Sequence, residues 1–453
     1  MLIAINPAND EIVGEYETHT DNDVQNIIER TQATWLDWRN TTFEFRSVLM
    51  HQAAGILRKN RESYARLMSL EMGKLNGEAR AEVEKCAWVC DYYADAAADF
   101  LKDEVIETDA SRSFIAFEPI GIVLAVMPWN FPFWQVFRFA APALMAGNAA
   151  VLKHASNVPG SALAIESIFR EAGFPEHLFR SLKIPASQVA VVIRDPRVKA
   201  VTLTGSEVAG MRVAVEAGRA LKKTVLELGG SDPYIVLEDA DISACAKMAA
   251  TARMINCGQS CIAAKRFIVV ESRVEEFAAR QAQILANMKI GDPLDETTEV
   301  GPMARVDLRD ELHQQVVQSL DQGARLITGG EPLPGPGAFY IPTVVTDVKK
   351  GMPLYDQETF GPVSAIIPVK NVEQAIAVAN DSEFGLGGAV WTQDVKFGEA
   401  VARRIESGAV FVNGMTKSDP RLPFGGVKRS GYGRELSHYG IKEFVNIKTI
   451  WIG

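Results

Sequence analysis

Strand and helix signals alternate between residues 121 and 230, and this alternation restricts the fold more than any other feature of the sequence. Short apolar runs such as GIVLAVMP (121–128) and VKAVTLTG (198–205) are separated by stretches with apolar residues three and four apart, as in SEVAGMRVAVEAGRAL (206–221). Buried strands joined by helices are typical of a mostly parallel sheet covered by helices. A second alternating set runs from about 230 to 430. We therefore expect an α/β fold.

The rest of the chain has simpler patterns. Residues 22–100 show apolar positions at helical spacing and predict consecutive amphipathic helices. The segment DEVIETDASRSFIAFEPI (103–120) predicts an extended hairpin, and the tail EFVNIKTIWIG (443–453) predicts a strand. Nothing later in the chain covers the edge of that strand, so a partner chain could cover it. A chain of 453 residues indicates two or three domains.

Composition excludes several classes of function. Hydrophobic residues make up 47% and charged residues 23% of a chain with a net charge of −10, which argues against nucleic acid as a partner. The five cysteines form no Cys-x-x-Cys pair and the histidines are scattered, so we expect neither a disulfide framework nor a metal site. No signal peptide is visible, and the most apolar stretch is interrupted by prolines and Asn. We expect a cytoplasmic protein that does not enter a membrane.

A phosphate site is indicated by TLTGSEVAG (202–210). Gly205, Ser206 and Gly210 lie where a strand passes into a helix, and backbone N–H groups at a helix start favour a phosphate. The spacing is not the dinucleotide fingerprint G-x-G-x-x-G, and a tight structural turn explains it equally well. The strand before, VLKHAS, places Lys153 and Ser156 at the same edge of the sheet. Neutral Ser156 would tolerate a 2′-phosphate that an acidic residue would repel. The alternative for Lys153 is an ordinary lysine on the solvated surface.

A nucleophile and a base are candidates in two further motifs. Glu227 lies in the apolar strand TVLELGG, where desolvation would raise its pKa towards the range of a general base. Cys261 lies in NCGQSCIAAKRF, and a Cys nucleophile with a carboxylate base suits covalent acyl chemistry. A strand-end Glu that points to water is the simpler alternative. Cys257 fits a small buried residue, although it lies close enough in sequence for a reversible disulfide with Cys261.

The motif PWNFP (128–132) and the helix after it hold two more candidates. The Asn130 amide could stabilise an oxyanion together with a backbone N–H, although Asn is also common in Pro-rich turns. Arg138 lies in an apolar helix, where burial is costly without an anion. That anion is either a ligand or a structural Asp or Glu.

The ordered motifs resemble the aldehyde dehydrogenase superfamily over essentially the whole chain, and within it the compact bacterial succinate-semialdehyde dehydrogenases. The matching stretches are PWNFP, VLKHAS, TLTGS, LELGGSDP, GQSCIAAKR, GDPLDETTEVGPM, ETFGPV, NDSEFGLGG and LPFGGVKRSGYGRE. The resemblance implies that Cys261 forms a thiohemiacetal whose oxyanion is held by Asn130 and the Cys261 N–H. Hydride transfer to the nicotinamide then gives a thioester, from which water activated by Glu227 releases the acid.

The resemblance also implies the cofactor and substrate contacts. The implied cofactor residues are Trp129, Lys153, Ser156, Gly205, Ser206, Glu358 and Phe360. The implied substrate residues are Arg138, Trp134 and Ser418. Many members have Glu where Ser156 stands, which favours NADP and leaves NAD open. Some members have Arg in place of Ile255, so this chain has fewer positive groups for recognising a substrate carboxylate. Many members have Lys in place of Phe139, so whether Glu435 relays protons here stays open.

The family fold implies a division of the chain. Residues 1–100 and 120–229 would form a Rossmann-type cofactor domain, and 230–430 an α/β catalytic domain. A hairpin at 101–119 and a strand at 440–453 would form a small β element that joins subunits into a homodimer or homotetramer.

We therefore expect NADP-preferring oxidation of succinate semialdehyde. The alternatives are a dehydrogenase for glutarate semialdehyde or an aromatic aldehyde, for which Trp134 and Phe139 would form an apolar pocket, and a non-catalytic binding protein on this fold. The joint presence of Cys261, Glu227 and Asn130 argues against the last alternative.

Overall fold

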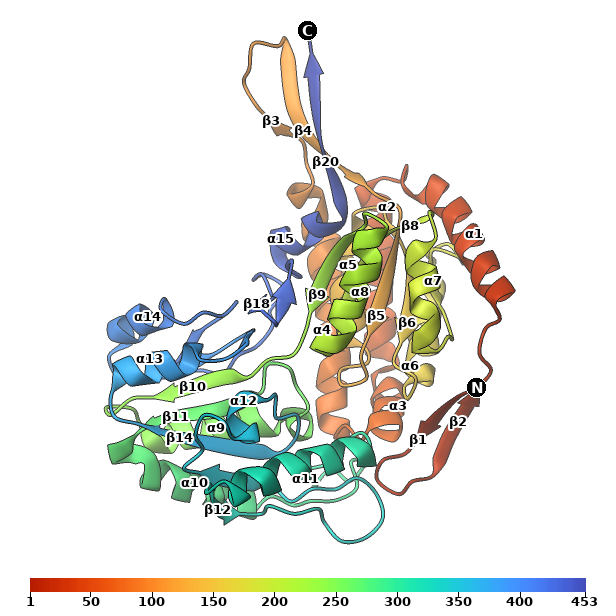
Figure 1. The fold of residues 1–453 in the computed structure, drawn as a ribbon. Helices are drawn as coiled ribbons and strands as arrows, with labels where there is room; N and C mark the ends of the chain where they lie inside the picture. The colour runs from red at the N-terminus through yellow and green to blue at the C-terminus, as the bar shows by residue number, and fades with distance from the viewer.

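Three β-sheets organise the computed structural model, which describes residues 1–453 (Figure 1). Two of them are wide and mostly parallel, and the third is a narrow antiparallel sheet that stands out from the rest of the molecule. The expected α/β fold is confirmed.

The first sheet has the strand order β19-β9-β8-β5-β6-β7. Its strands are β5 (Ile122–Met127), β6 (Ala149–His154), β7 (Phe179–Ser181), β8 (Val198–Thr204), β9 (Lys223–Glu227) and β19 (Gly431–Tyr432). All neighbours are parallel except β19, which pairs antiparallel with β9. Chain order reverses between β5 and β8, and ligands bind at such a switch point beyond the carboxyl ends of the strands.

Helices cover this sheet. Those between its strands are α5 (Trp134–Met145), α6 (Pro159–Glu171), α7 (Val189–Arg194) and α8 (Glu207–Arg219). The predicted amphipathic region forms α1 (Asp21–Trp38), α2 (Phe43–Lys59), α3 (Arg61–Met72) and α4 (Asn76–Phe100). An N-terminal hairpin of β1 (Leu2–Ile5) and β2 (Ile12–Tyr16) was not predicted. Helix α4 packs against α2, α3 and α5.

The second sheet has the order β12-β13-β14-β11-β10-β16-β17, in which only β12 is antiparallel. Its strands are β10 (Asp232–Val236), β11 (Ala264–Val270), β12 (Arg325–Thr328), β13 (Thr343–Thr346), β14 (Val363–Val369), β16 (Ala389–Trp391) and β17 (Phe411–Val412). The associated helices are α9 (Ile242–Met254), α10 (Val274–Ala286), α11 (Val306–Asp321), α12 (Pro353–Asp356), α13 (Val372–Asn380) and α14 (Val395–Ala402). Two short strands, β15 (Phe384–Gly385) and β18 (Val427–Lys428), pair with each other.

The third sheet, which we call the arm, has the order β20-β4-β3. It joins β3 (Glu104–Val105), β4 (Arg112–Pro119) and the C-terminal β20 (Val445–Ile452), which follows α15 (Ser437–Ile441). The expected hairpin and C-terminal strand are therefore confirmed. Figure 1 shows the arm projecting at the top of the molecule, with β20 at its free edge.

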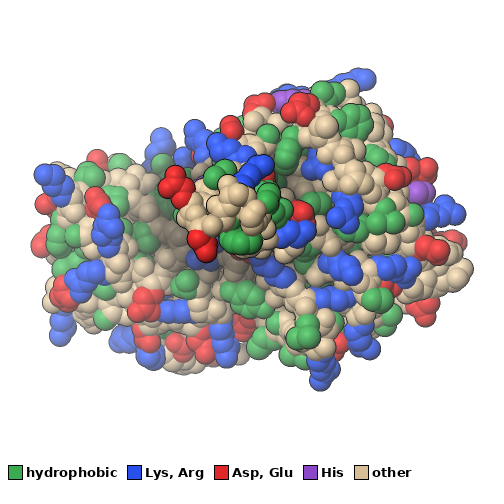
Figure 2. All heavy atoms as spheres, turned by 90° about the horizontal axis from the view of Figure 1, so that it is seen from above, with side chains coloured by type: hydrophobic (Ala, Val, Ile, Leu, Met, Phe, Trp, Pro, Cys, Tyr) green, Lys and Arg blue, Asp and Glu red, His purple; other side chains and the backbone are tan.

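Each wide sheet has its own apolar core. Cys86 and Cys90 are fully buried in the first core, as expected for core packing, and Cys257 is buried in the second. The face seen in Figure 2 carries acidic and basic side chains interspersed, without a large block of one sign. None of the helices has the length and apolarity required to cross a bilayer.

Candidate active site

Cys261 follows a tightly wound loop between α9 and β11. Asn256, Cys257 and Gly258 all have positive φ, at 54°, 54° and 73°, a conformation that costs energy for the two residues that are not glycine. The Glu78 carboxylate on α4 accepts a hydrogen bond from the Asn256 N–H at 3.1 Å. Arg253 donates to the carbonyl of Gly258 and, at 3.1 Å, to that of Ala264. These contacts hold the strained loop in place immediately before the candidate nucleophile.

The residue Cys261 is partly exposed, and its thiol forms no disulfide. Burial raises its pKa to about 11, while Lys265 and Arg138 act in the opposite direction by favouring the thiolate. Its backbone N–H donates no hydrogen bond within the chain. A nucleophile with a free N–H beside it could hold both the carbon and the oxygen of a carbonyl group.

Two glycines let the wide sheets meet at this point. A Cβ atom at Gly230 would lie 2.6 Å from the Cys261 carbonyl oxygen, and one at Gly229 would lie 2.5 Å from the Glu358 carboxylate. Glu358 instead accepts hydrogen bonds from the Gly230 N–H at 3.0 Å and from Lys265 Nζ at 2.8 Å. Lys265 Nζ also donates to the Cys261 carbonyl at 2.7 Å. Predicted residues of the LELGG, GQSC and ETFGP motifs therefore come together.

Asn130 lies at the start of the segment that leads into α5. Its side-chain amide donates to the Gln259 carbonyl at 3.1 Å, which ties it to the loop of Cys261, and its buried Oδ1 has no partner. The Asn130 carbonyl accepts hydrogen bonds from Lys74 Nζ at 2.9 Å and from Asn256 Nδ2 at 2.7 Å. One amide hydrogen of Asn130 is left for a ligand, which is compatible with the predicted oxyanion contact.

The first turn of α5 is held by Glu82 of α4. One carboxylate oxygen accepts from the N–H groups of Phe133 and Trp134, both at 2.9 Å, and so satisfies donors that a helix start leaves free. The other oxygen forms a buried ion pair with Lys74. Through Lys74, the pair reaches the Asn130 carbonyl.

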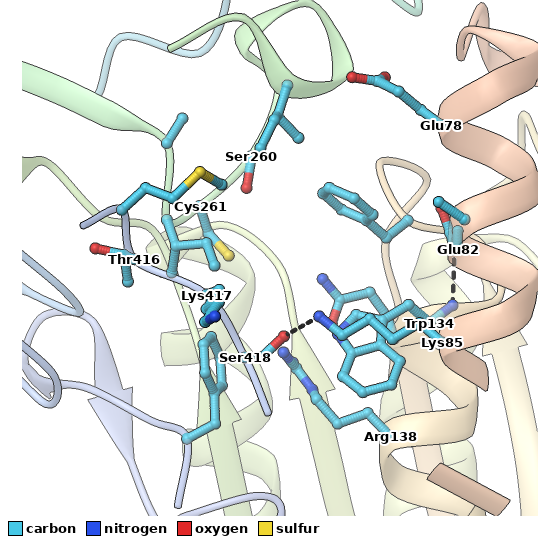
Figure 3. A pocket seen from close by; sticks show the side chains of 18 of the residues that line it. Glu78, Glu82, Lys85, Trp134, Arg138, Ser260, Cys261, Thr416, Lys417 and Ser418 are labelled. Atoms are coloured by element: carbon cyan, nitrogen blue, oxygen red, sulfur yellow. Dashed lines mark hydrogen bonds between the residues drawn. The ribbon is translucent and has the colours of Figure 1, made fainter. Parts of the chain in front are cut away.

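Cys261 opens into a cavity of about 290 Å³ between α4, α5 and residues 415–424. Three predicted substrate residues, Trp134, Arg138 and Ser418, line the same cavity (Figure 3). Lys85 of α4 also lines it and was not predicted. Its Nζ donates to Ser418 Oγ at 2.7 Å and lies 4.3 Å from the centroid of the Trp134 ring. Burial, together with the charge of Arg138, lowers the Lys85 pKa to about 8.

Arg138 has an internal partner. It forms a buried ion pair with Glu435, donates to Thr204 Oγ1 at 3.3 Å and stacks on Phe424 at 4.6 Å. Glu227 is 2% exposed, and burial followed by the charge of Glu435 raises its pKa well above the ordinary value. Both carboxylate oxygens of Glu227 lack hydrogen-bond partners, and Glu227 does not line the cavity. The structure thus places Glu227 in a buried group with Arg138 and Glu435.

The prediction that Phe139 would form an apolar pocket with Trp134, made for the alternative substrates, is wrong. Phe139 is buried and packs edge-to-face against Phe444, with ring centroids 5.7 Å apart, and it does not line the cavity. Trp134 and Arg138 are four residues apart on α5 and share a face, whereas the next residue, Phe139, points about 100° around the helix.

Predicted cofactor residues surround the carboxyl ends of the first sheet. Ser206 is the exposed N-cap of α8 and accepts from the Ala209 N–H at 3.3 Å, and the Gly205 N–H donates to the Glu227 carbonyl. Trp129, after β5, packs edge-to-face against Phe360, which precedes β14 of the second sheet, with ring centroids 5.9 Å apart. Ser206 and Glu358 line one further hollow of about 300 Å³. These elements outline a cleft between the two wide sheets.

The residues in this cleft fit an anionic dinucleotide. Lys153, at the end of β6, is 8% exposed, and its ammonium makes no ion pair or hydrogen bond within the chain. Burial lowers its pKa, which is a cost that a phosphate or ribose partner would offset. Ser156 is exposed and borders a hollow of about 680 Å³, whose lining also includes Arg305.

Sequence reasoning missed Lys85, Lys265 and Glu82. Glu82 and Lys85 belong to a helix whose polar positions look like an ordinary solvated face, and Lys265 lies near the start of the mostly apolar strand β11. The signal that could have found two of them is the spacing of Glu78, Glu82 and Lys85, which places three charges on one face of α4.

Comparison with known proteins identifies relatives over the full length. The model of the aldehyde dehydrogenase family matches residues 2–450. A probable succinate-semialdehyde dehydrogenase (NADP+) of Synechocystis is 53% identical over 451 residues, covering 100% of this chain and 99% of the relative. A succinate-semialdehyde dehydrogenase (NADP+) of Mycobacterium avium is 50% identical over 456 residues, covering 100% and 97%.

A solved structure has the same fold. The succinic semialdehyde dehydrogenase of Streptococcus pyogenes in complex with NADP+ superposes with a TM-score of 0.98 at 42% identity, covering 100% of both chains.

Proposed function

The chain belongs to the aldehyde dehydrogenase family and is an NAD(P)-dependent oxidoreductase, and we propose that it oxidises succinate semialdehyde to succinate with NADP+. The observation that carries the substrate assignment is the cavity of Cys261. Its volume of about 290 Å³ suits a small aldehyde, and its lining brings Lys85 and Arg138 close to the nucleophile. The names of the relatives from Synechocystis, Mycobacterium avium and Streptococcus pyogenes support the same substrate and cofactor.

We propose that the reaction starts at sulfur. The Cys261 thiolate, favoured by Lys265 and Arg138, adds to the aldehyde carbon and forms a thiohemiacetal. The developing oxyanion accepts hydrogen bonds from the Cys261 N–H and the Asn130 amide, which lowers the barrier to addition. When bound, the nicotinamide supplies a hydride acceptor, so that the cysteine carries an acyl group as a thioester.

Hydrolysis completes the proposed reaction. Glu227 removes a proton from water, whose oxygen attacks the thioester carbon, and the carbon–sulfur bond breaks to release the carboxylate and restore Cys261. The balance is aldehyde, NADP+ and water to carboxylate, NADPH and two protons. Because Glu227 lies with Arg138 and Glu435 rather than in the cavity, its side chain must turn towards the thioester for this step.

The cleft at the carboxyl ends of the first sheet supports the cofactor assignment. Ser206 and the N-terminus of α8 would hold the pyrophosphate, Lys153 and Ser156 the adenine ribose and its 2′-phosphate, and Glu358 the nicotinamide ribose. Trp129 and Phe360 would flank the nicotinamide. In this division, residues 1–100 and 120–229 bind the cofactor and 230–430 supply the nucleophile.

We further propose a cytoplasmic homodimer or homotetramer joined through the arm, formed by residues 101–119 and 440–453. Support comes from the five free thiols, which suit a reducing compartment, and from the exposed Ile447 and Trp451 on the free edge strand β20.

A second candidate is oxidation of an aromatic aldehyde. Phe131, Trp134 and Phe424 line the cavity and give it an apolar wall.

A substrate panel distinguishes these functions. We expect kcat/KM for succinate semialdehyde with NADP+ to exceed the values for benzaldehyde and butanal, which lack a carboxylate, by at least about tenfold, as expected from one charged hydrogen bond. Glutarate semialdehyde keeps the carboxylate and is one methylene longer, so its kcat/KM tests the length of the cavity. Repeating the panel with NAD+, and with a Ser156→Glu variant, tests the cofactor preference. A wild-type enzyme that uses butanal or benzaldehyde as well as succinate semialdehyde would contradict the proposal.

A further inference from the structure

Lys265 is a fully buried lysine near the start of β11, between the nucleophile and the cofactor cleft. Its side chain is 0% exposed, and its ammonium makes a single ion pair, with Glu358 at 2.8 Å. The same ammonium donates to the Cys261 carbonyl at 2.7 Å and lies 5.7 Å from the centroid of the Phe360 ring. One side chain therefore contacts the nucleophile and two of the residues assigned to the nicotinamide end of the cofactor.

Arg266, the next residue of β11, is also buried but has a different environment. Successive side chains of a strand point to opposite faces, and the Arg266 guanidinium donates only to three backbone carbonyl groups. Those contacts join structural segments. Lys265, in contrast, is paired with a carboxylate that lines the same hollow as Ser206. Of the two neighbouring cations, only Lys265 is directed at the site.

The hydrogen bonds of Glu358 are concentrated on one oxygen. Oε1 accepts from Lys265 Nζ at 2.8 Å and from the Gly230 N–H at 3.0 Å, whereas Oε2 accepts no hydrogen bond from the chain. A Cβ atom at Gly229 would lie 2.5 Å from Oε2, so the glycine keeps the space beside this oxygen open. A purely structural pair is most stable when both carboxylate oxygens are satisfied. The observed arrangement orients the carboxylate and leaves Oε2 for a ligand hydroxyl.

We propose that Lys265 is a positioning residue for hydride transfer: anchored on the Cys261 carbonyl, it holds Glu358 Oε1 so that Oε2 is presented to the nicotinamide ribose. This inference rests on the proposed function, in which Glu358 binds that ribose. Without Lys265, Glu358 would be held by the Gly230 N–H alone, about which the carboxylate can turn. Because the anchor is the peptide group of the nucleophile itself, Lys265 sets the ribose contact relative to the sulfur, where an error of about 1 Å costs about a hundredfold in rate.

Ligand binding to the cofactor-free enzyme tests this contact without turnover. Calorimetry compares NADP+ with adenosine 2′,5′-bisphosphate, which carries the adenosine and the 2′-phosphate but no nicotinamide ribose. In Lys265→Met we expect the Kd of NADP+ to rise about tenfold, as for the loss of one charged hydrogen bond, and the Kd of the bisphosphate to stay within about twofold. Lys350→Met is the control, since Lys350 is exposed and pairs with Asp381, and it should change neither Kd.

Equal weakening of both ligands in Lys265→Met would indicate a general structural role and overturn the inference, as would an unchanged Kd for NADP+. A wild-type enzyme that binds the bisphosphate as tightly as NADP+ would refute the assignment of Glu358 to the nicotinamide ribose, and the inference would fall with it. The same titrations therefore distinguish a failure of the inference from a failure of the proposed function.

A double-mutant cycle shows whether Lys265 acts through Glu358. The measured quantity is the rate of the NADPH burst with the aldehyde that the wild-type enzyme oxidises fastest, so the result does not depend on the substrate assignment. We expect this rate to fall about tenfold to a hundredfold in Lys265→Met and in Glu358→Gln, and no further in the double variant, because residues that act as one unit give non-additive effects. The reduced rates should depend on deuterium at the aldehyde carbon, since hydride transfer is the step affected.

The double variant also decides the matter if Lys265→Met does not fold. It removes both charges of the pair and leaves no buried ion without a partner, a change that buried pairs tolerate better than the loss of one member. A burst in the double variant as fast as that of Glu358→Gln would support the inference. A burst at least about tenfold slower would show that Lys265 acts apart from Glu358 and would refute it, as would an unchanged burst in Lys265→Met.

Discussion

At the scale of single residues, the ionisation states of Cys261 and Glu227 are linked through Arg138. Burial raises the pKa of both groups, and the positive charge of Arg138 lowers both. A thiol with a pKa of about 11 is protonated at neutral pH, so that formation of the thiolate requires a proton acceptor. A buried carboxyl group with a raised pKa can hold a proton at that pH. The reaction therefore depends on whether the proton lies on the Cys261 thiol or on the Glu227 carboxyl group, both of which are influenced by Arg138.

Glu227→Gln tests which step uses this carboxyl group. If Glu227 acts only in hydrolysis, we expect kcat to fall about a hundredfold to ten-thousandfold while rapid mixing still shows a burst of about one NADPH per subunit. Glu238→Gln is a matched control, because Glu238 lies just beyond the end of β10 and is exposed, whereas Glu227 is the buried last residue of β9. Loss of the burst in Glu227→Gln would show that Glu227 is needed before the thioester forms, as the base that activates Cys261.

At the scale of secondary-structure elements, α4 supplies three charges to the site from one face. Glu78 holds the strained loop before Cys261, Glu82 caps α5, and Lys85 enters the cavity. The helix thus joins the loop of the nucleophile to the segment that carries Asn130. Its role is positioning as much as packing.

Glu82→Gln tests this link. The variant leaves the Lys74 ammonium buried without its partner and weakens the cap of α5, so we expect a loss of about 3 kcal/mol of unfolding free energy, as for other broken buried pairs. Because the Lys74 contact to the Asn130 carbonyl would also change, kcat should fall. Denaturant unfolding and steady-state kinetics measure the two effects.

Glu84→Gln provides the comparison on the same helix. Glu84 is exposed and pairs with Arg58 in solvent, so its loss should change stability by less than about 1 kcal/mol. Equal stability of the Glu82 and Glu84 variants would contradict the capping role of Glu82.

The elements that could be predicted from the sequence are those with a strong local period. The strands at 122–127, 149–154 and 198–204 and the helix after Ser206 are continuous apolar runs or regular amphipathic stretches, and the structure contains all of them. The hairpin β1–β2 and the short strands β7, β15 and β18 were missed, because two to five residues carry too little pattern.

The site was predictable where a residue type is rare in its context. Cys261 and Asn130 stand in distinctive motifs, so the sequence predicts a role for each of them. Lys85 could not be predicted, because a lysine on an amphipathic helix looks the same whether it meets water or a cavity. Likewise, Arg138 pairs with Glu435, which lies almost 300 positions away in the sequence. Only the folded chain shows that the anion beside Arg138 is a structural Glu.

At the scale of the whole molecule, the arm lies apart from the Cys261 cavity. The Cys261 cavity is built from residues of one chain, and none of them belongs to the arm. On β20, Ile447 and Trp451 lie on one face because they are four residues apart in a strand, and they are 59% and 56% exposed. Ile447 pairs with Phe117 of β4, which extends the same apolar face across the arm.

Charges placed on this face should prevent assembly. For an Ile447→Asp, Trp451→Asp double variant we expect a particle smaller than the wild-type oligomer, down to the 49.5 kDa subunit, in sedimentation or light scattering. Asn446→Asp is the matched control, since Asn446 lies on the opposite face of β20 and is also exposed. An unchanged mass for the double variant would exclude the arm as the interface. Because the cavity does not use the arm, the free subunit should still form the Cys261 thioester, so a monomer unable to form it would show that assembly is needed to shape the site.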